Sequence, residues 1–142
     1  MKVGFTGRRE GLNSCQVNMF YDTLETIGNI SEFHHGDCVG ADAEAHDIVA
    51  NLNEFIAKHI HPPEKQDLRA FCNPDAIYKP KSYFARNRDI VDMSDVMVAC
   101  PPTDVDPGRG GTWYTINYAR KQGKPIYICY PNGTVGKENF ND

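Results

Sequence analysis

The chain has 142 residues, which suffices for a single domain with a buried core spanning 1–142. A formal net charge of −4 and a pI near 5.7 exclude the basic composition typical of duplex nucleic-acid binders. No apolar stretch approaches the roughly 20 residues of a membrane-spanning helix, and Met1-Lys2-Val3 leads into a strand rather than a signal peptide. We therefore expect a cytoplasmic protein without a membrane partner, whose five scattered cysteines are reduced thiols.

The first half of the chain alternates predicted strands and helices. Residues 2–6 form a short apolar strand, and a glycine- and arginine-containing loop follows at 7–11. Asn13 and Gln16 resemble a capping pair that opens a helix, whose apolar residues repeat at helical spacing as far as Ile27. The pattern then predicts a strand at 32–35, a glycine turn at 36–42 that opens a helix ending near Leu52, and a strand at 55–60.

The regular pattern fails between residues 62 and 82, where four prolines interrupt it. A segment of this length without regular structure predicts either a functional flap over a site or an ordinary surface loop, with room for a short helix at 66–71. A polar C-terminal tail is expected at 131–142.

The last third of the chain predicts one βαβ unit. An apolar strand at 96–100 leads into a glycine-rich loop at 107–112, then a helix at 113–121 and a second apolar strand at 125–130. Strand–helix alternation along the chain predicts an α/β fold: a Rossmann-like, doubly wound and mostly parallel sheet of about five strands in three α/β/α layers.

Three loops rich in glycine or arginine follow predicted strands, at 6–9, 36–42 and 107–112. In a parallel sheet these loops meet at one edge, where bare backbone N–H groups and helix N-termini hold anions. We therefore predict a pocket for a phosphorylated ligand, with these ligand-binding candidates: Thr6, Gly7, Arg8, Gly36, Asp37, Gly40, Asp42, Arg86, Asn87, Gly110, Gly111 and Thr112.

Several of these residues also have a purely structural interpretation. The glycines can serve tight turns, and aspartates at helix starts cap free N–H groups. Arg86 and Arg88 point about 200° apart on a helix, so we choose Arg86 as the phosphate clamp, against a surface ion pair with Asp89 or Asp92. Arg8 is a second clamp candidate, and Arg109 either contacts the ligand or faces water.

Aromatic and histidine residues give weaker signals. Tyr83, Trp113 and Tyr114 either stack on a base or belong to the core. Five histidines invite a metal site, but the sequence has no HExxH or Cys/His cluster, and adjacent strand residues such as His34 and His35 point to opposite faces. We therefore expect no metal and no cofactor.

At these same loops the sequence resembles the SLOG superfamily, the Rossmann-like group that includes the DprA proteins and the "lonely guy" phosphoribohydrolases, and within it the small YspA- or YpsA-type proteins. The resemblance covers most of the chain outside 62–82 and the tail. The matching motifs are Gly4-Phe5-Thr6-Gly7-Arg8, His35-Gly36-Asp37-Cys38-Val39-Gly40-Ala41-Asp42, Ala85-Arg86-Asn87-Arg88, Gly110-Gly111-Thr112 and Gly123-Lys124-Pro125-Ile126.

The resemblance implies a nucleotide or ADP-ribose-like ligand, held by a sensor or sequestering module that forms a homodimer or larger homo-oligomer. The lonely guy enzymes carry a PGGxGTxxE loop, whose glutamate position is occupied here by Thr115. Glycosidic cleavage needs a carboxylate near the oxocarbenium-like centre. The alternative function, an N-glycosidase or phosphoribohydrolase acting on nucleoside monophosphates, therefore requires Asp37, Asp42 or Asp89 as the catalytic group. Single-stranded nucleic-acid binding, as in DprA, is a third class, against which the acidic total charge argues.

Overall fold

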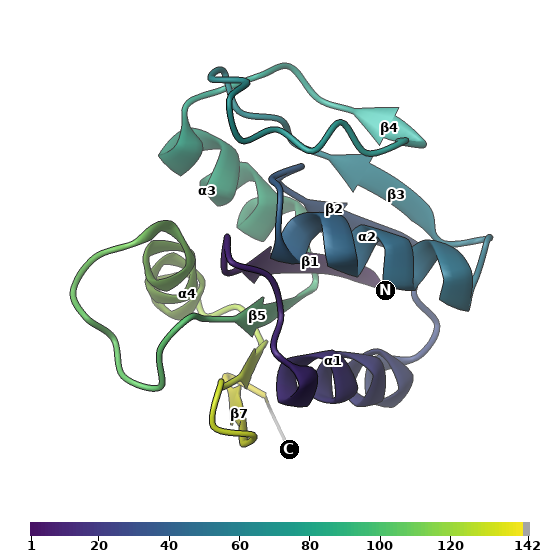
Figure 1. The fold of residues 1–142 in the computed structure, drawn as a ribbon. Helices are drawn as coiled ribbons and strands as arrows, with labels where there is room; N and C mark the ends of the chain where they lie inside the picture. The colour runs from purple at the N-terminus through teal and green to yellow at the C-terminus, as the bar shows by residue number, and fades with distance from the viewer. Residues whose placement is uncertain (141–142) are drawn as a thin grey trace.

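A computed structural model describes residues 1–140 and contains one seven-stranded sheet between two pairs of helices (Figure 1). The strand order is β4-β3-β2-β1-β5-β6-β7, and every neighbouring pair is parallel except β6 and β7. In chain order the elements are β1 (Lys2–Gly7), α1 (Ser14–Ile27), β2 (Glu32–His35), α2 (Ala41–Leu52), β3 (Ala57–Ile60), β4 (Ala76–Ile77), α3 (Tyr83–Met93), β5 (Val96–Cys100), α4 (Gly111–Lys121), β6 (Ile126–Cys129) and β7 (Val135–Glu138). The expected doubly wound, three-layer α/β/α fold is confirmed.

Each face of the sheet carries its own apolar core. On one face, Phe20 and Leu24 of α1 and Val49 of α2 pack against alternate residues of β1, β2 and β5. On the other face, Ile90 of α3 and Ile116 of α4 pack against the intervening residues of β5 and β6. The alternation of side chains along each strand makes these two cores possible in a sheet covered on both sides.

The site is positioned by the topology around β1. From β1 the chain builds β2, β3 and β4 outward on one side, and then crosses over to add β5 and β6 on the other. The direction of strand addition therefore reverses between β1 and β5, the place where doubly wound sheets leave a crevice beyond the carboxyl ends of their strands. Gly7 at the carboxyl end of β1 is paired in register with Cys100 at the carboxyl end of β5.

The sheet has seven strands, so the expected number of about five was too low. The two additional strands lie in segments that were read as irregular: β4 has two residues within 62–82, and β7 lies within the expected tail. Neither segment carries an alternating apolar pattern, because both strands are at the edges of the sheet and no residue in either is fully buried. Residues 66–71 form no helix, and residues 141–142 of the tail lie outside the described part of the chain.

The predicted start of the first helix is confirmed. Asn13 and Gln16 form a reciprocal capping box at the start of α1. All five cysteines are free, with Cys100 and Cys129 buried in β5 and β6. Within residues 1–140 no helix combines the length and the apolarity needed to span a bilayer.

Gly40 joins the loops after β1 and β2 by a close backbone approach. Its φ is +90°, and a Cβ there would collide with the carbonyl oxygen of Arg9. We predict that Gly40→Ala lowers the free energy of unfolding by about 3 kcal/mol or more, from a clash added to a left-handed backbone. The matched control is Gly108→Ala, with φ +77° and open space around its Cα, which should cost only about 1–2 kcal/mol. Equal losses in urea denaturation would contradict this role.

Candidate functional site

A cleft of about 380 Å³ lies beyond the carboxyl ends of β1 and β5. Its walls come from the loop after β1, the start of the β2–α2 connection, the first turns of α3, and the loop that leads into α4. The loops predicted to converge therefore do so. The lining residues are Phe5, Thr6, Gly7, Arg8, Arg9, Glu10, Gly36, Cys38, Asp42, Tyr83, Phe84, Arg86, Asn87, Ile90, Pro102, Arg109, Gly110, Gly111, Thr112 and Trp113.

Most of the residues predicted to bind the ligand share this cleft. Only Asp37 and Gly40 among them are absent from its walls. The ten that line it are Thr6, Gly7, Arg8, Gly36, Asp42, Arg86, Asn87, Gly110, Gly111 and Thr112. Their contact with a ligand stays a prediction, whereas their proximity is a property of the fold.

The start of α4 presents unused backbone donors to the cleft. Gly110 at the N-cap has no side chain to cap the helix, and its φ of +96° is a conformation that favours glycine. A Cβ on Gly111 would meet only Asn87, at 3.9 Å, so packing does not require a glycine at that position. An uncapped N-terminus with bare glycine backbone is a suitable anion site.

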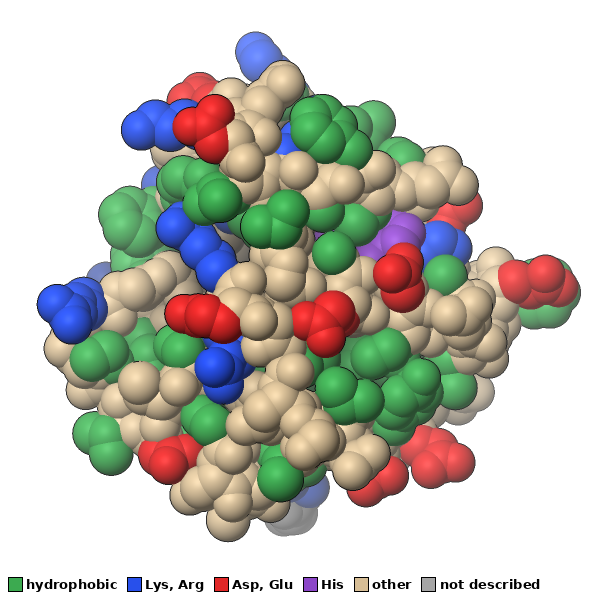
Figure 2. All heavy atoms as spheres, in the orientation of Figure 1, with side chains coloured by type: hydrophobic (Ala, Val, Ile, Leu, Met, Phe, Trp, Pro, Cys, Tyr) green, Lys and Arg blue, Asp and Glu red, His purple; other side chains and the backbone are tan. Residues whose placement is uncertain are grey.

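The loop after β1 adds positive charge. The Nε of Arg8 is buried and has no hydrogen-bond partner within residues 1–140, and it lies 3.9 Å from the exposed carboxylate of Glu10. Arg9 contacts the ring of Tyr83, with the guanidinium carbon 5.5 Å from the ring centroid. Figure 2 shows basic side chains on the face between α3, α4 and this loop, with acidic side chains beside them. The helix α1 begins at Ser14, so this loop contributes side chains and not a helix N-terminus to the cleft.

Arg86 is buried and largely committed to structure. Its side chain, 4% exposed, donates to the carbonyl oxygens of Gly36 and His61 and, through Nε, to Asn87 at 2.7 Å. A Cβ on Gly36 would collide with this guanidinium, so glycine makes room for it. Arg86 is thus a brace between α3 and the ends of β2 and β3, which also borders the cleft. Arg88 lies outside the cleft and donates to the hydroxyl of Tyr114 at 2.8 Å.

Asp42 is the carboxyl group at the cleft with the most unusual environment. Burial raises its pKa from 3.8 to about 6, while Arg86 and backbone N–H groups, including that of Cys38 at 3.2 Å, limit the rise. A carboxyl group that titrates near neutrality can accept hydrogen bonds from ribose or exchange a proton with a substrate.

Asp37 has a structural role and does not line the cleft. Its fully buried carboxylate forms an ion pair with Arg69 at 2.6 Å and accepts a hydrogen bond from the backbone N–H of Cys72 at 2.8 Å. These contacts anchor the 62–82 segment to the β2–α2 connection. None of the residues that line the cleft belongs to that segment.

Sequence reasoning missed some residues of the cleft and placed others differently. Phe84 was not considered, although its ring is 53% exposed at the rim and lies 4.3 Å from that of Tyr114. Its position next to Tyr83 at the start of α3 was the available signal. Trp113 is buried and donates to Thr103 at 2.9 Å, which fixes the loop before α4. Thr115 is buried and bonded to the carbonyl oxygen of Gly111 at 2.8 Å.

In the described part of the chain, side chains of the types that can bind a metal ion cluster at two places outside the cleft. Two groups of three within residues 1–140 have donor atoms within 4.8 Å of one another, and neither contributes to the cleft wall. They are Glu32, His34 and His59 on one face of the sheet, and His35, His46 and Cys72 on the other.

No protein-family model matches the sequence, and no curated protein matches it. Solved structures do match the fold. The molybdenum cofactor binding protein of Rippkaea orientalis has a TM-score of 0.67 at 20% identity, with 89% of this chain and 74% of that chain covered. The protein TM1055 has a TM-score of 0.63 at 18% identity, with 88% of this chain and 71% of that chain covered.

DNA processing protein A of Helicobacter pylori, whose structure describes a single-stranded DNA binding mode, has a TM-score of 0.62 at 20% identity, with 90% of this chain and 64% of that chain covered. This match supports the same Rossmann-like fold. At these identities the likeness is one of fold alone.

The raised pKa of Asp42 predicts a specific dependence of stability on pH. With a native pKa of about 6 against 3.8 for the unfolded chain, the native state binds more protons between these values, so stability falls as pH rises from 4 to 6. Relative to Asp42→Asn, the wild type should lose roughly 2 kcal/mol of unfolding free energy between pH 4 and 6, and only about 0.4 kcal/mol more above pH 6. Parallel stability curves for the two proteins from pH 4 to 7 would contradict the assignment.

Proposed function

We propose that this protein binds a nucleotide or nucleotide-derived ligand of the ADP-ribose type in the cleft, as a sensor or sequestering module. The observation that carries the proposal is the pairing of two unused donor sets on one cleft: the uncapped N-terminus of α4 and the buried, unpartnered Nε of Arg8. A buried polar group without a hydrogen-bond partner costs free energy, and an anionic ligand would remove that cost at Arg8. At the exposed start of α4 the ligand would replace water as the acceptor for the free N–H groups.

The phosphate groups occupy the end of the cleft at Gly110, Gly111 and Thr112. There the N–H groups of the first turn of α4 point at the anion, and the hydroxyl of Thr112 adds a donor. Arg8 approaches the anion from the loop after β1 through charge-assisted hydrogen bonds. Arg9 and Arg109, also on the cleft wall, raise the local concentration of anions.

The nucleoside part lies toward α2 and α3. Asp42 accepts hydrogen bonds from ribose hydroxyls in its ionised form, and the exposed ring of Phe84 gives a base a surface for stacking. Arg86 shapes the floor through its carbonyl contacts. Its removal would disturb the fold, so it is not the residue on which to test binding.

Arg8 and Gly111 provide the test. We predict that Arg8→Ala weakens ADP-ribose binding in calorimetry by about 1.5–3 kcal/mol, the size of a hydrogen bond to a charged group. Gly111→Ala should raise the free energy of unfolding by up to about 1 kcal/mol, since alanine favours a helix, yet weaken binding because its methyl group crowds the phosphate. The matched control is Arg88→Ala, which removes an arginine of the same helix as Arg86 from outside the cleft.

Equal affinity in all three variants, or no binding by the wild type to ADP-ribose, ADP or AMP, would refute the proposed function. A single-stranded oligonucleotide belongs in the same series. Binding of the oligonucleotide with a steep salt dependence, in the absence of nucleotide binding, would instead favour single-stranded DNA binding of the kind described for DNA processing protein A.

A second function is favoured by the position of Asp42. Of the three candidates for the catalytic group, Asp37, Asp42 and Asp89, Asp42 is the one that lines the cleft, and its pKa of about 6 suits proton transfer. Asp89 lies outside the cleft, in an ion pair with Lys81 at 2.6 Å. The alternative is therefore an N-glycosidase or phosphoribohydrolase acting on nucleoside monophosphates. The ion pair of Asp37 with Arg69 removes it from this role.

Chromatography for free base separates binding from hydrolysis. Incubation with a panel of nucleoside monophosphates should release base only if the enzyme function holds, and Asp42→Asn should then reduce the release by at least 100-fold. Arg88→Ala should leave it unchanged. Release that persists in Asp42→Asn would exclude Asp42 as the catalytic group.

We also expect a homodimer or larger homo-oligomer, as the SLOG resemblance implies, and a cytoplasmic location, as the sequence predicts. Light scattering coupled to size-exclusion chromatography measures the assembly directly, and a monomeric mass at all concentrations would remove this expectation.

A further inference from the structure

Histidine and tyrosine rings cluster on one face of β2 and β3, outside both apolar cores. His34 and His59 are register partners on these two strands, and Glu32 lies two residues before His34 on the same face. Their strand positions therefore point all three side chains to one side. Neither core cluster contains any of the three.

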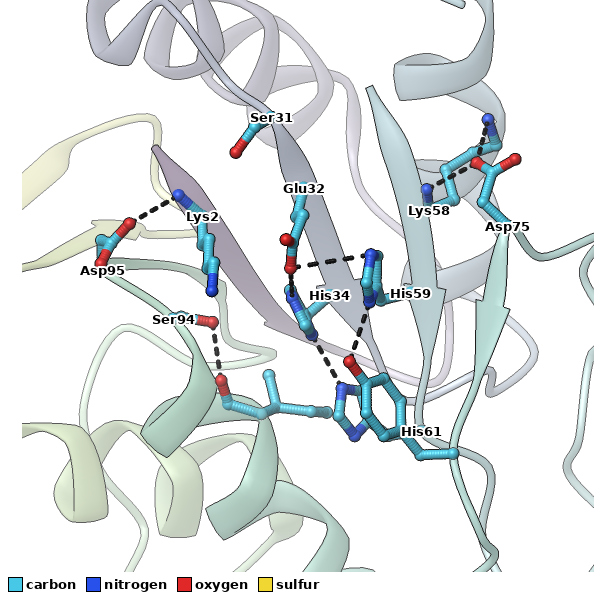
Figure 3. Close-up of polar contacts among 12 residues, drawn as sticks. Lys2, Ser31, Glu32, His34, Lys58, His59, His61, Asp75, Ser94 and Asp95 are labelled. Carbon is cyan, nitrogen blue, oxygen red and sulfur yellow. Dashed lines mark hydrogen bonds and ion pairs between the residues drawn. The ribbon is translucent and has the colours of Figure 1, made fainter. Parts of the chain in front are cut away.

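The donor atoms of this trio already converge. The Nε2 of His34 lies 2.9 Å from Oε1 of Glu32, and the Nε2 of His59 lies 3.6 Å from the same oxygen. Figure 3 shows both rings turned toward that carboxylate. All three atoms are within 4.8 Å of one another. Tetrahedral coordination at about 2.1 Å needs donors roughly 3.4 Å apart, which a small movement of the partly exposed His59 and Glu32 supplies.

The other nitrogen of each ring is held in place. His34 uses Nδ1 for a 2.9 Å contact with Nε2 of His61, and His59 uses Nδ1 for a 2.9 Å contact with the hydroxyl of Tyr78. The rings of His61 and Tyr78 are themselves stacked, with centroids 4.1 Å apart. Outer contacts of this kind orient histidine ligands and set which nitrogen faces a metal.

We propose that Glu32, His34 and His59 bind one divalent transition-metal ion of the Zn²⁺ class. Two imidazoles and a carboxylate are a ligand set that zinc uses when a fourth position stays open to water. The side chains of Glu32 and His59 are 25% and 16% exposed, so an ion and its water can enter. Loading moves the proton of His34 from Nε2 to Nδ1 and that of His61 from Nε2 to Nδ1, and both rings remain neutral.

The second histidine group does not share these properties. His35 and His46 are both buried and contact each other through Nε2 and Nδ1, so an ion has less access to them than to the partly exposed Glu32 and His59. Burial and the Asp37 carboxylate raise the pKa of Cys72 to about 12, which disfavours a thiolate ligand. His46 is also bonded to the backbone of Asn73. This group therefore serves as the internal control.

The sequence predicted no metal site for two reasons: it has no HExxH or Cys/His cluster, and adjacent strand residues point to opposite faces. That reasoning is right for His34 and His35, which belong to different groups on different faces. It did not consider pairing across strands, which brings His59 beside His34. Glu32 and His34 are two residues apart on β2 and therefore share one face, and the register of β2 with β3 places His59 beside them.

The test is titration of chelator-treated protein with Zn²⁺ alone, followed by calorimetry and metal analysis. The wild type should bind one equivalent per chain, and Glu32→Gln and His59→Ala should each weaken binding by more than about 100-fold. Tyr78→Phe should weaken it by roughly 10-fold, as expected for an outer contact. Cys72→Ser, in the second group, should bind as the wild type does. Circular dichroism verifies that each variant is folded.

Two outcomes would overturn the proposal. One is the absence of saturable Zn²⁺ binding by the folded wild type. The other is binding that survives His59→Ala and is lost in Cys72→Ser, which would move the ion to the second group. Co²⁺ provides an independent readout, since a tetrahedral site gives intense visible absorption that Glu32→Gln should diminish. Because Glu32, His34 and His59 lie outside the cleft, these results are independent of nucleotide binding.

Discussion

The guanidinium of Arg86 is the interaction on which the arrangement of the cleft depends. It enters from α3, passes over the bare Cα of Gly36, and satisfies the carbonyl oxygens at the ends of β2 and β3. A buried cation persists only when its donors are used, so α3 and the two strand ends are fixed relative to one another. Its charge also restrains the rise in the pKa of Asp42. The clamp predicted from sequence is in this way chiefly a brace that shapes the site.

The order of elements could be predicted from sequence because it rests on local signals. Helix starts at Asn13 and Ala41 and the buried strand 96–100 have patterns that tertiary contacts do not override. The edge strands β4 and β7 could not be predicted, since their residues pair through the backbone and bury little apolar surface. Pairing of this kind has almost no signature in side-chain composition.

The roles of individual residues were less predictable than their proximity. Parallel topology alone brings the loops after β1, β2 and β5 to one edge, which is why most of the candidate residues share a cleft. Asp37 and Asp42 are five positions apart and were expected in one glycine turn, where they looked equivalent, whereas Asp42 lies in the first turn of α2. The structure separates them, because Arg69, distant in sequence, pairs with Asp37 and leaves Asp42 at the cleft. The sequence contains no local sign of that pairing.

Backbone amide NMR tests the central claim most directly, because the account assigns the phosphate to main-chain donors. During titration with ADP-ribose, the largest shifts should occur at the amides of Gly110, Gly111 and Thr112, together with the Nε–H signal of Arg8. Amides in β7, on the far edge of the sheet, should stay unchanged. Shifts confined to residues outside the cleft, or no shifts at millimolar ligand, would contradict the account.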